Sequence, residues 1–118
     1  MGMTNPLLSP QDPISCDSGN MGCNGGYLNM VWYYMRNQGV VLESCFPYTA
    51  GSGYAERCIS YCKNGAPFTK YYASNYYNLY SPSMIMLELV ENGPVQTGFN
   101  VYSDFMNYSG GIYVHTYG

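Results

Sequence analysis

A chain of 118 residues can form one domain at most, with a hydrophobic core of adequate size. Only 9% of the residues are charged and the formal net charge is -3, which excludes the basic surface that binds nucleic acid or anionic lipid. No apolar run approaches the ~18 residues of a membrane-spanning helix, so we expect neither nucleic acid nor a membrane as a partner.

The start of the chain and its cysteines indicate different compartments. The first residues lack the charged and apolar regions of a signal peptide and the hydroxyl residue of a myristoylation site. Five cysteines, however, are too many for a small reduced cytosolic domain without metal. Either the protein is cytosolic or its biological N-terminus differs from Met1, and the cysteine count favours the second. Because five is odd, an oxidised chain would keep one thiol without an internal partner.

Two helices are predicted in the first third of the chain. Ser9, Pro10 and Asp12 fit the N-cap, first and third positions of a short helix, a carboxylate variant of the capping box. The stronger prediction is an amphipathic helix that follows Tyr27 and ends at Gly39 as its C′ residue. Its apolar residues recur at intervals of three and four: Leu28, Val31, Trp32 and Met35.

The remainder of the chain predicts loops, one more helix and several strands. Residues 40–68 are rich in Gly, Pro and Cys, so covalent ties rather than regular structure should order them. The doubled tyrosines of 69–80 suit an extended strand, and a capped helix is predicted over 81–91. In residues 95–101, positions with Val, Thr or Phe alternate with Gln, Gly or Asn, which predicts a strand, and residues 110–117 resemble another strand. Helices followed by strands argue for an α+β fold.

The stretch CNGGYLNMVWYYMRNQG, residues 23–39, places a cysteine and two glycines before the stronger helix. It allows four interpretations: a phosphate-binding loop, half of a metal site, a disulfide beside a tight turn, or a backbone wall for an extended ligand. Neither GxGxxG nor GxxxxGK[ST] is present, which argues against phosphate. The three-residue gap in CISYC, residues 58–62, lies at the edge of common zinc-ligand spacings, and no CxxC pair faces it, so disulfides are the better default. The zinc ligands considered were Cys16, Cys23, Cys58, Cys62 and His115.

Three further features of the sequence could indicate a functional site, but each has a simpler explanation. His115 is the only histidine, but no nucleophile or orienting group can be placed beside it, so we assign it to packing or the surface. Asn107-Tyr108-Ser109 fits the N-glycosylation pattern, which often arises by chance. The fifteen tyrosines should cover half-buried strands rather than form a sugar-binding platform.

Four segments share an order and spacing with one protein family: LSPQDPISCD, GCNGGYLNMVWYYMRNQGVV, CFPYTAGSG and ENGPVQTGFNVYSDFMNYSGGIYVHTYG. They resemble papain-like cysteine peptidases, nearest to the cathepsin B-like branch, over nearly all of Leu8 to Gly118. In that family a helical left domain and a β-rich right domain face each other across a cleft. The resemblance implies an α+β fragment in which residues 1–118 are the central part of one peptidase domain. About 8–68 would belong to the left domain, and about 69–118 would lead into right-domain strands.

The resemblance also implies a thiol endopeptidase whose catalytic residues lie outside this chain. The nucleophilic cysteine would precede Leu8, and the catalytic histidine and asparagine would follow Gly118. Neither Cys23 nor His115 matches those positions, so we expect no catalytic residue, no cofactor, no metal and no hydrolysis by this chain alone. The missing remainder of the domain would be a partner, and the compartment lysosomal, vacuolar or extracellular. The alternative is a non-catalytic pseudopeptidase or a truncated binding module.

The family pattern implies a role for every cysteine. It pairs Cys16 with Cys58 and Cys45 with Cys62, and it leaves Cys23 for a cysteine near the missing nucleophile. Between Cys45 and Cys58 the chain has no histidine, whereas cathepsin B carries a longer occluding loop with histidines. We therefore expect endopeptidase activity rather than release of dipeptides.

The expected ligand is an extended peptide substrate that pairs with a Gly-Gly backbone edge, as in β-augmentation. Gly25 and Gly26 match that edge, where a Cβ would obstruct close approach. The pocket for the second residue before the scissile bond would lie between Leu28 and Gly98, which favours bulky apolar or aromatic side chains. The full predicted substrate-binding set is Asn24, Gly25, Gly26, Tyr27, Leu28 and Gly98.

Overall fold

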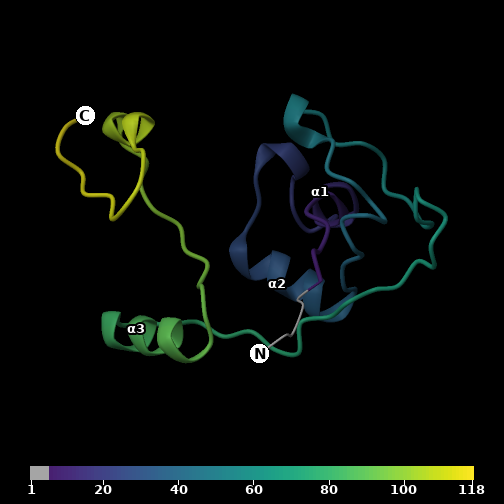
Figure 1. Cartoon of the computed structure of the whole chain (residues 1–118), viewed down its shortest axis with the longest axis horizontal. Helices are drawn as coiled ribbons and strands as arrows, with labels where there is room; N and C mark the ends of the chain where they lie inside the picture. The colour runs from purple at the N-terminus through teal and green to yellow at the C-terminus, as the bar shows by residue number, and fades with distance from the viewer. Residues whose placement is uncertain (1–5) are drawn as a thin grey trace. The chain divides into compact units, whose positions relative to one another are not determined.

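The computed structural model describes residues 6–118 as two compact units, the first ending at Tyr80 and the second comprising Ser81–Gly118 (Figure 1). Its elements in chain order are α1 (Gln11–Cys16), η1 (Gly22–Asn24), α2 (Leu28–Asn37), η2 (Ala50–Ser52), α3 (Pro82–Glu91) and η3 (Ser103–Asn107), where η marks a 3-10 helix. None of the described helices is long and apolar enough to cross a membrane.

The start of α1 agrees only in part with the predicted capping box, because the Ser9 N–H donates to the Val41 carbonyl rather than to the Asp12 carboxylate. The Asp12 N–H donates to the Ser9 hydroxyl at 3.1 Å, so Ser9 satisfies one of the first free N–H groups of a helix that continues to Cys16. The same hydroxyl donates to the Phe46 carbonyl at 2.7 Å. One serine therefore starts the helix and attaches it to the core.

The ends of α2 are also as predicted, but its burial is not. Gly39 has a φ of +76°, and its N–H donates to the Tyr34 carbonyl at 3.0 Å, which closes the last turn. Tyr34 is the one residue of Leu28–Asn37 that the structure describes as buried. Leu28, in the expected apolar stripe, is 43% exposed. The face predicted to be covered is therefore only partly covered.

The predicted helix in the second half of the chain is confirmed as α3. The Ser81 hydroxyl accepts the Met84 N–H at 3.2 Å, and Pro82 occupies the first turn. Gly93, with a φ of +102°, follows the end of the helix at Glu91. No residue of this helix is described as buried. Its ends are therefore defined by capping rather than by packing within its unit.

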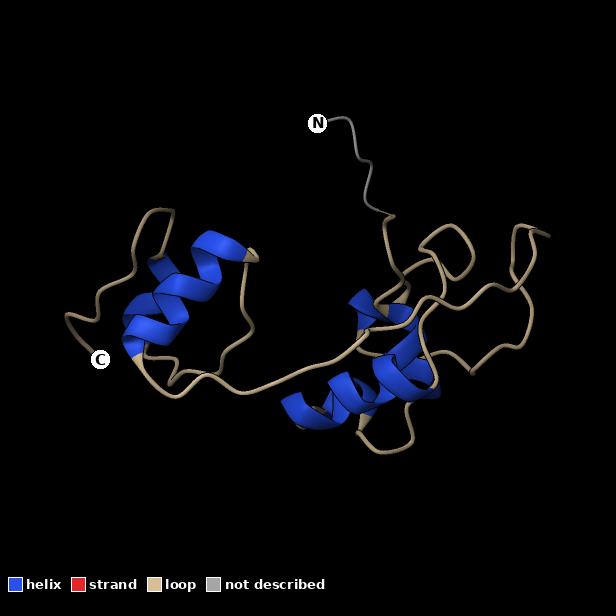
Figure 2. Cartoon of the chain, turned by 90° about the horizontal axis from the view of Figure 1, so that it is seen from below, coloured by secondary structure: helices blue, strands red, loops and turns tan. Residues whose placement is uncertain are grey.

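The predicted strands are wrong for the described part of the chain. Figure 2 draws 69–80, 95–101 and 110–117 as loops, and residues 6–118 contain isolated β-bridges but no strand. Alternating apolar residues indicate a segment that can be half-buried, whereas a strand also needs a neighbouring backbone with which to pair. Among the described residues, 69–80 pairs only at the single bridge between Tyr71 and Val40, and no bridge is formed by 95–101 or 110–117. The expected α+β mixture is therefore seen here as helices and loops.

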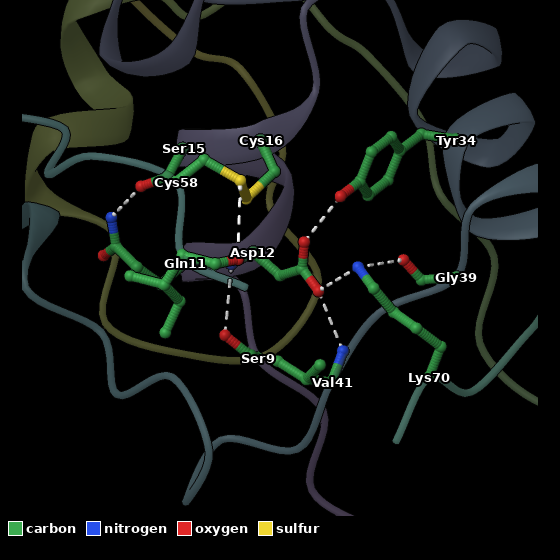
Figure 3. Close-up of a disulfide and its surroundings, with 11 residues drawn as sticks. Ser9, Gln11, Asp12, Ser15, Cys16, Tyr34, Gly39, Val41, Cys58 and Lys70 are labelled. Carbon is green, nitrogen blue, oxygen red and sulfur yellow. Dashed lines mark hydrogen bonds and ion pairs between the residues drawn. A yellow bond between two sulfur atoms is a disulfide. The ribbon is translucent and has the colours of Figure 1, made fainter. Parts of the chain in front are cut away.

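Asp12 of α1 joins three segments of the first unit (Figure 3). Its carboxylate accepts the Tyr34 hydroxyl at 2.6 Å and the Val41 N–H at 2.9 Å, and it pairs with the Lys70 ammonium at 3.0 Å. Burial, and then the hydrogen bond to Asp12, raise the pKa of Tyr34 above its usual value, so the phenol remains a donor. The side chain of Asp12 is only 1% exposed, which makes this a fully paired buried charge.

Two disulfides order the loop-rich segment around this core. Cys16 is bonded to Cys58 and Cys45 to Cys62, over sequence separations of 42 and 17 residues. Closed loops of these lengths stabilise a fold by about 4 and about 3 kcal/mol in the chain-entropy description. These are the pairs that the family resemblance implies. Cys23 is an exposed free thiol.

Replacing Asp12 by Ala should lower the free energy of unfolding by about 3 kcal/mol or more, because the Val41 N–H and the Lys70 ammonium would lose their buried acceptor. The matched variant Tyr34→Phe removes one donor and leaves Asp12 paired, so a loss of about 1 kcal/mol is expected. Urea denaturation followed by circular dichroism measures both. Equal losses would contradict the central role of Asp12.

Alkylation of the unfolded, oxidised chain should add one label per molecule, on Cys23, because the other cysteines are in disulfides. Intact mass spectrometry counts the labels, and peptide mapping locates them. Reduction before alkylation is the control and should raise the count to the full 5 cysteines. Two or more labels without reduction would refute the pairing.

Candidate functional site

The candidate site is the loop between α1 and α2, residues 17–27, which carries both predicted edge glycines. Backbone hydrogen bonds close this loop on itself. The Met21 N–H donates to the Gly25 carbonyl at 2.9 Å, and the Gly25 N–H donates to the Gly22 carbonyl at 3.4 Å. Both backbone groups of Gly25 are therefore used inside the loop.

Gly26 differs from its neighbour, because neither its N–H nor its C=O has a hydrogen-bond partner among residues 6–118. The residue is also exposed. A free donor and a free acceptor on one exposed residue are what an extended peptide needs in order to pair alongside. We call these two backbone groups the Gly26 edge.

The two glycines are needed for different reasons. Gly25 has a φ of +111°, in a region that residues with a Cβ rarely adopt, although a Cβ there would meet no atom within 4 Å. A Cβ on Gly26 would lie 2.5 Å from Oδ1 of Asn20, so that space is already occupied. The chain itself thus requires glycine at both positions, in addition to the approach of a ligand expected from the sequence.

The other predicted substrate residues divide between the two units. Asn24 lies in η1 and is exposed, and Tyr27 and Leu28 follow at the start of α2 with 64% and 43% of their surface exposed. Gly98 belongs to the second unit, in a loop where a Cβ would meet no atom within 4 Å. The structure therefore brings Asn24 to Leu28 together where the loop meets α2 and places Gly98 in the other unit.

Three of the four cysteines considered for zinc, Cys16, Cys58 and Cys62, are bound in disulfides, and Cys23 is a free thiol. In the part of the chain that is described, no group of three or more His, Cys, Asp or Glu side chains is placed to hold a metal ion. The CISYC pair therefore cross-links the chain.

Asp104 was not predicted from the sequence, yet it organises the C-terminal segment. Its carboxylate accepts the Tyr113 hydroxyl at 2.5 Å, the Thr116 N–H at 2.6 Å and the Tyr117 N–H at 3.2 Å. Burial would raise the pKa of Asp104, but these donors and His115 together hold it well below its usual range. One acid in an aromatic stretch does not reveal its donors, because they lie up to 13 residues away.

His115 is packed within this cluster. Its Nδ1 lies 3.2 Å from both carboxylate oxygens of Asp104, and its ring stacks on Tyr102 with the centroids 3.8 Å apart. The structure thus places beside His115 an orienting carboxylate that the sequence did not reveal, and the histidine side chain remains 39% exposed. Burial, and then the hydrogen bond to Asp104, raise the pKa of Tyr113 to about 12.

Comparison with known proteins gives consistent matches over most of the chain. The family model for papain family cysteine proteases matches residues 2–118. Cathepsin B-like CP3 of Giardia intestinalis is 43% identical over 114 residues, which cover 93% of this chain and 38% of that protein. Cathepsin B of Dictyostelium discoideum is 34% identical over 129 residues, which cover 97% of this chain and 42% of that protein. The chain thus spans about two fifths of the length of these relatives.

A solved structure shows the same similarity. Procathepsin B S9 from Trypanosoma congolense superposes with a TM-score of 0.67 at 25% sequence identity. The match covers 77% of this chain and 33% of that chain. The backbone of the described residues therefore resembles part of a papain-like fold, even though it holds helices and loops without strands.

Replacing Asp104 by Asn should lower the pKa of Tyr113 from about 12 toward its ordinary value of 10.0, because the carboxylate that opposes phenolate formation is removed. In the parent chain the raised pKa contributes stability that is complete below pH ~10 and lost as the pH rises through 12. NMR of tyrosines labelled at 13Cζ follows the titration, with Tyr113→Phe identifying the signal. The control Glu56→Gln removes a carboxylate of the first unit and should change nothing. An ordinary pKa for Tyr113 in the parent chain would contradict this account.

Proposed function

Because the chain belongs to the papain family of cysteine proteases, we propose that it forms part of the substrate cleft of a papain-like endopeptidase. The observation that carries this proposal is the Gly26 edge, a free N–H and C=O beside exposed apolar side chains. An extended peptide can pair with such an edge through its main chain, as an added strand does. Pairing of this kind tolerates many peptide sequences, which suits proteolysis.

The chemistry proposed for the whole enzyme is nucleophilic catalysis by a thiolate. The thiolate adds to the scissile carbonyl carbon, and a thioester forms as the amine leaves with a proton from the imidazolium. Water then hydrolyses the thioester with the imidazole as base. We propose that these catalytic groups come from outside the 118 residues, since the chain spans 38% of a relative's length. Cys23 would then be structural, and His115 a packing residue.

The remainder of the peptidase domain is the proposed partner of this chain. Residues 8–68 would belong to the helical left domain, and 69–118 would lead into the right domain. The extended segments 95–101 and 110–117 would pair there with strands of the remainder. Two disulfides suit an oxidising compartment, which supports a lysosomal, vacuolar or extracellular location.

Side-chain preference would come from the residues that flank the edge. Tyr27 and Leu28 present exposed apolar surface directly after Gly26. We therefore propose a bulky apolar or aromatic residue at the second position before the scissile bond. Between Cys45 and Cys58 there is no histidine to anchor the C-terminal carboxylate of a substrate. This supports endopeptidase action rather than the release of dipeptides.

Peptide binding by the chain tests the proposed cleft. A peptide capped at both ends, with Phe at the second position before the intended scissile bond, should shift the amide signals of Gly26 and Tyr27 in the 15N-labelled chain. The matched peptide with Asp in place of that Phe should bind about tenfold more weakly or worse, because it cannot bury an aromatic ring. Shifts confined to the second unit would contradict Gly26 as the binding edge.

Cleavage separates the leading proposal from its alternative. The 118-residue chain should bind the Phe peptide without releasing product. A polypeptide of the relatives' full length should cleave it internally and lose that activity when its thiols are alkylated. Binding without cleavage by the longer polypeptide would favour a pseudopeptidase, and removal mainly of C-terminal dipeptides would refute endopeptidase action.

A further inference from the structure

We infer that Asn20 is a positioning residue that aims the carbonyl of the Gly26 edge. The inference rests on the proposed function, because it describes how the proposed peptide-binding edge is held. Asn20 is partly buried and lies in the same loop as the edge. A Cβ on Gly26 would contact it, which places its side chain directly behind the edge.

The side chain of Asn20 makes two short hydrogen bonds of opposite sense. Its Oδ1 accepts the Tyr27 N–H at 2.6 Å, and its Nδ2 donates to the Asp17 carboxylate at 2.6 Å. A side-chain amide offers both an acceptor and a donor, as these two partners require. The far end of this chain of contacts is anchored, because Asp17 follows Cys16, which is bonded to Cys58.

The bond to Tyr27 controls Gly26 because the two residues share a peptide plane. The Gly26 carbonyl and the Tyr27 N–H belong to one trans peptide unit, in which C=O and N–H point in opposite directions. Holding the Tyr27 N–H against Asn20 therefore turns the Gly26 carbonyl away from Asn20. That is the direction from which a ligand can approach without meeting the loop.

The N–H of Gly26 is aimed in a similar way by the backbone of the loop. It shares a peptide unit with the Gly25 carbonyl, which accepts the Met21 N–H at 2.9 Å. Each free group of Gly26 thus stands opposite a hydrogen bond on the other side of its own peptide plane. A peptide that pairs with the edge meets groups that are already oriented, which reduces the entropy lost on binding.

Asn20→Ala tests the inference in the 118-residue chain. Amide exchange of Tyr27 should accelerate at least tenfold, and the Kd of the Phe peptide should rise about tenfold, as expected for the loss of one oriented hydrogen bond. The matched control is Asn64→Ala, which removes a similar bond from the Ala66 N–H to Asn64 Oδ1 at 3.0 Å in an exposed loop of the first unit. It should leave both quantities unchanged.

A purely structural role for Asn20 predicts a different result. Asn20→Ala would then lower the melting temperature but leave the peptide Kd unchanged under conditions where the chain is folded, and this outcome would overturn the inference. Asn20→Asp is the milder second variant, because it keeps an acceptor for Tyr27 while it places a second carboxylate against Asp17. It should therefore bind the peptide more tightly than Asn20→Ala does, and an equal loss of binding in the two folded variants would count against the inference.

The inference and the proposed function fail separately. If the parent chain binds no peptide, the proposed function is wrong. Slow exchange of the Tyr27 amide, lost in Asn20→Ala, would still support the orientation of Gly26. Fast exchange of the Tyr27 amide in the parent chain would overturn the inference, whatever the peptide does.

Discussion

The carboxylate of Asp12 is the interaction on which the first unit depends, because three segments each donate to this one buried group. Tyr34 brings α2, Val41 brings the segment after it, and Lys70 brings a residue 58 positions away in the chain. A buried carboxylate without these donors would be costly, so the segments are held together or the unit opens. The loop with the Gly26 edge runs from α1 to α2, and the hydrogen bond from Tyr34 to Asp12 holds these two helices together.

The second unit uses a carboxylate in the same way. Asp104 gathers hydroxyl and backbone donors from 113–117, in a segment whose residues are otherwise mostly exposed. Of the 7 acidic residues in the sequence, Asp12, Asp17 and Asp104 are buried in the structure. Much of the small charge content thus organises loops instead of solvating the surface. Where strands are lacking among the described residues, carboxylates supply the acceptors that a sheet would otherwise provide.

The parts of the structure that could be predicted from sequence are those that depend on near neighbours. Ser9, Ser81 and Gly39 define helix ends through bonds within one turn. Strands could not be predicted in this way, because pairing needs a second segment that the pattern of the first does not reveal. Asp12 was predictable as a helix residue but not as an acceptor of donors 22 to 58 residues away. The glycine pair identified the candidate site, whereas Asn20 acts across seven residues and leaves no spacing pattern.

Backbone recognition at Gly26 separates the direction of a bound peptide from the choice of its side chains. The direction depends on hydrogen bonds made behind the edge by Asn20 and Met21, and these use backbone groups of Gly25 and Tyr27. Any residue other than proline can supply the N–H at position 27, so its side chain is free to vary without turning the edge. Leu28 is the first residue of α2, and the helix backbone sets the direction of its side chain. A protein built in this way can change which peptides it prefers while the geometry that holds their main chain stays the same.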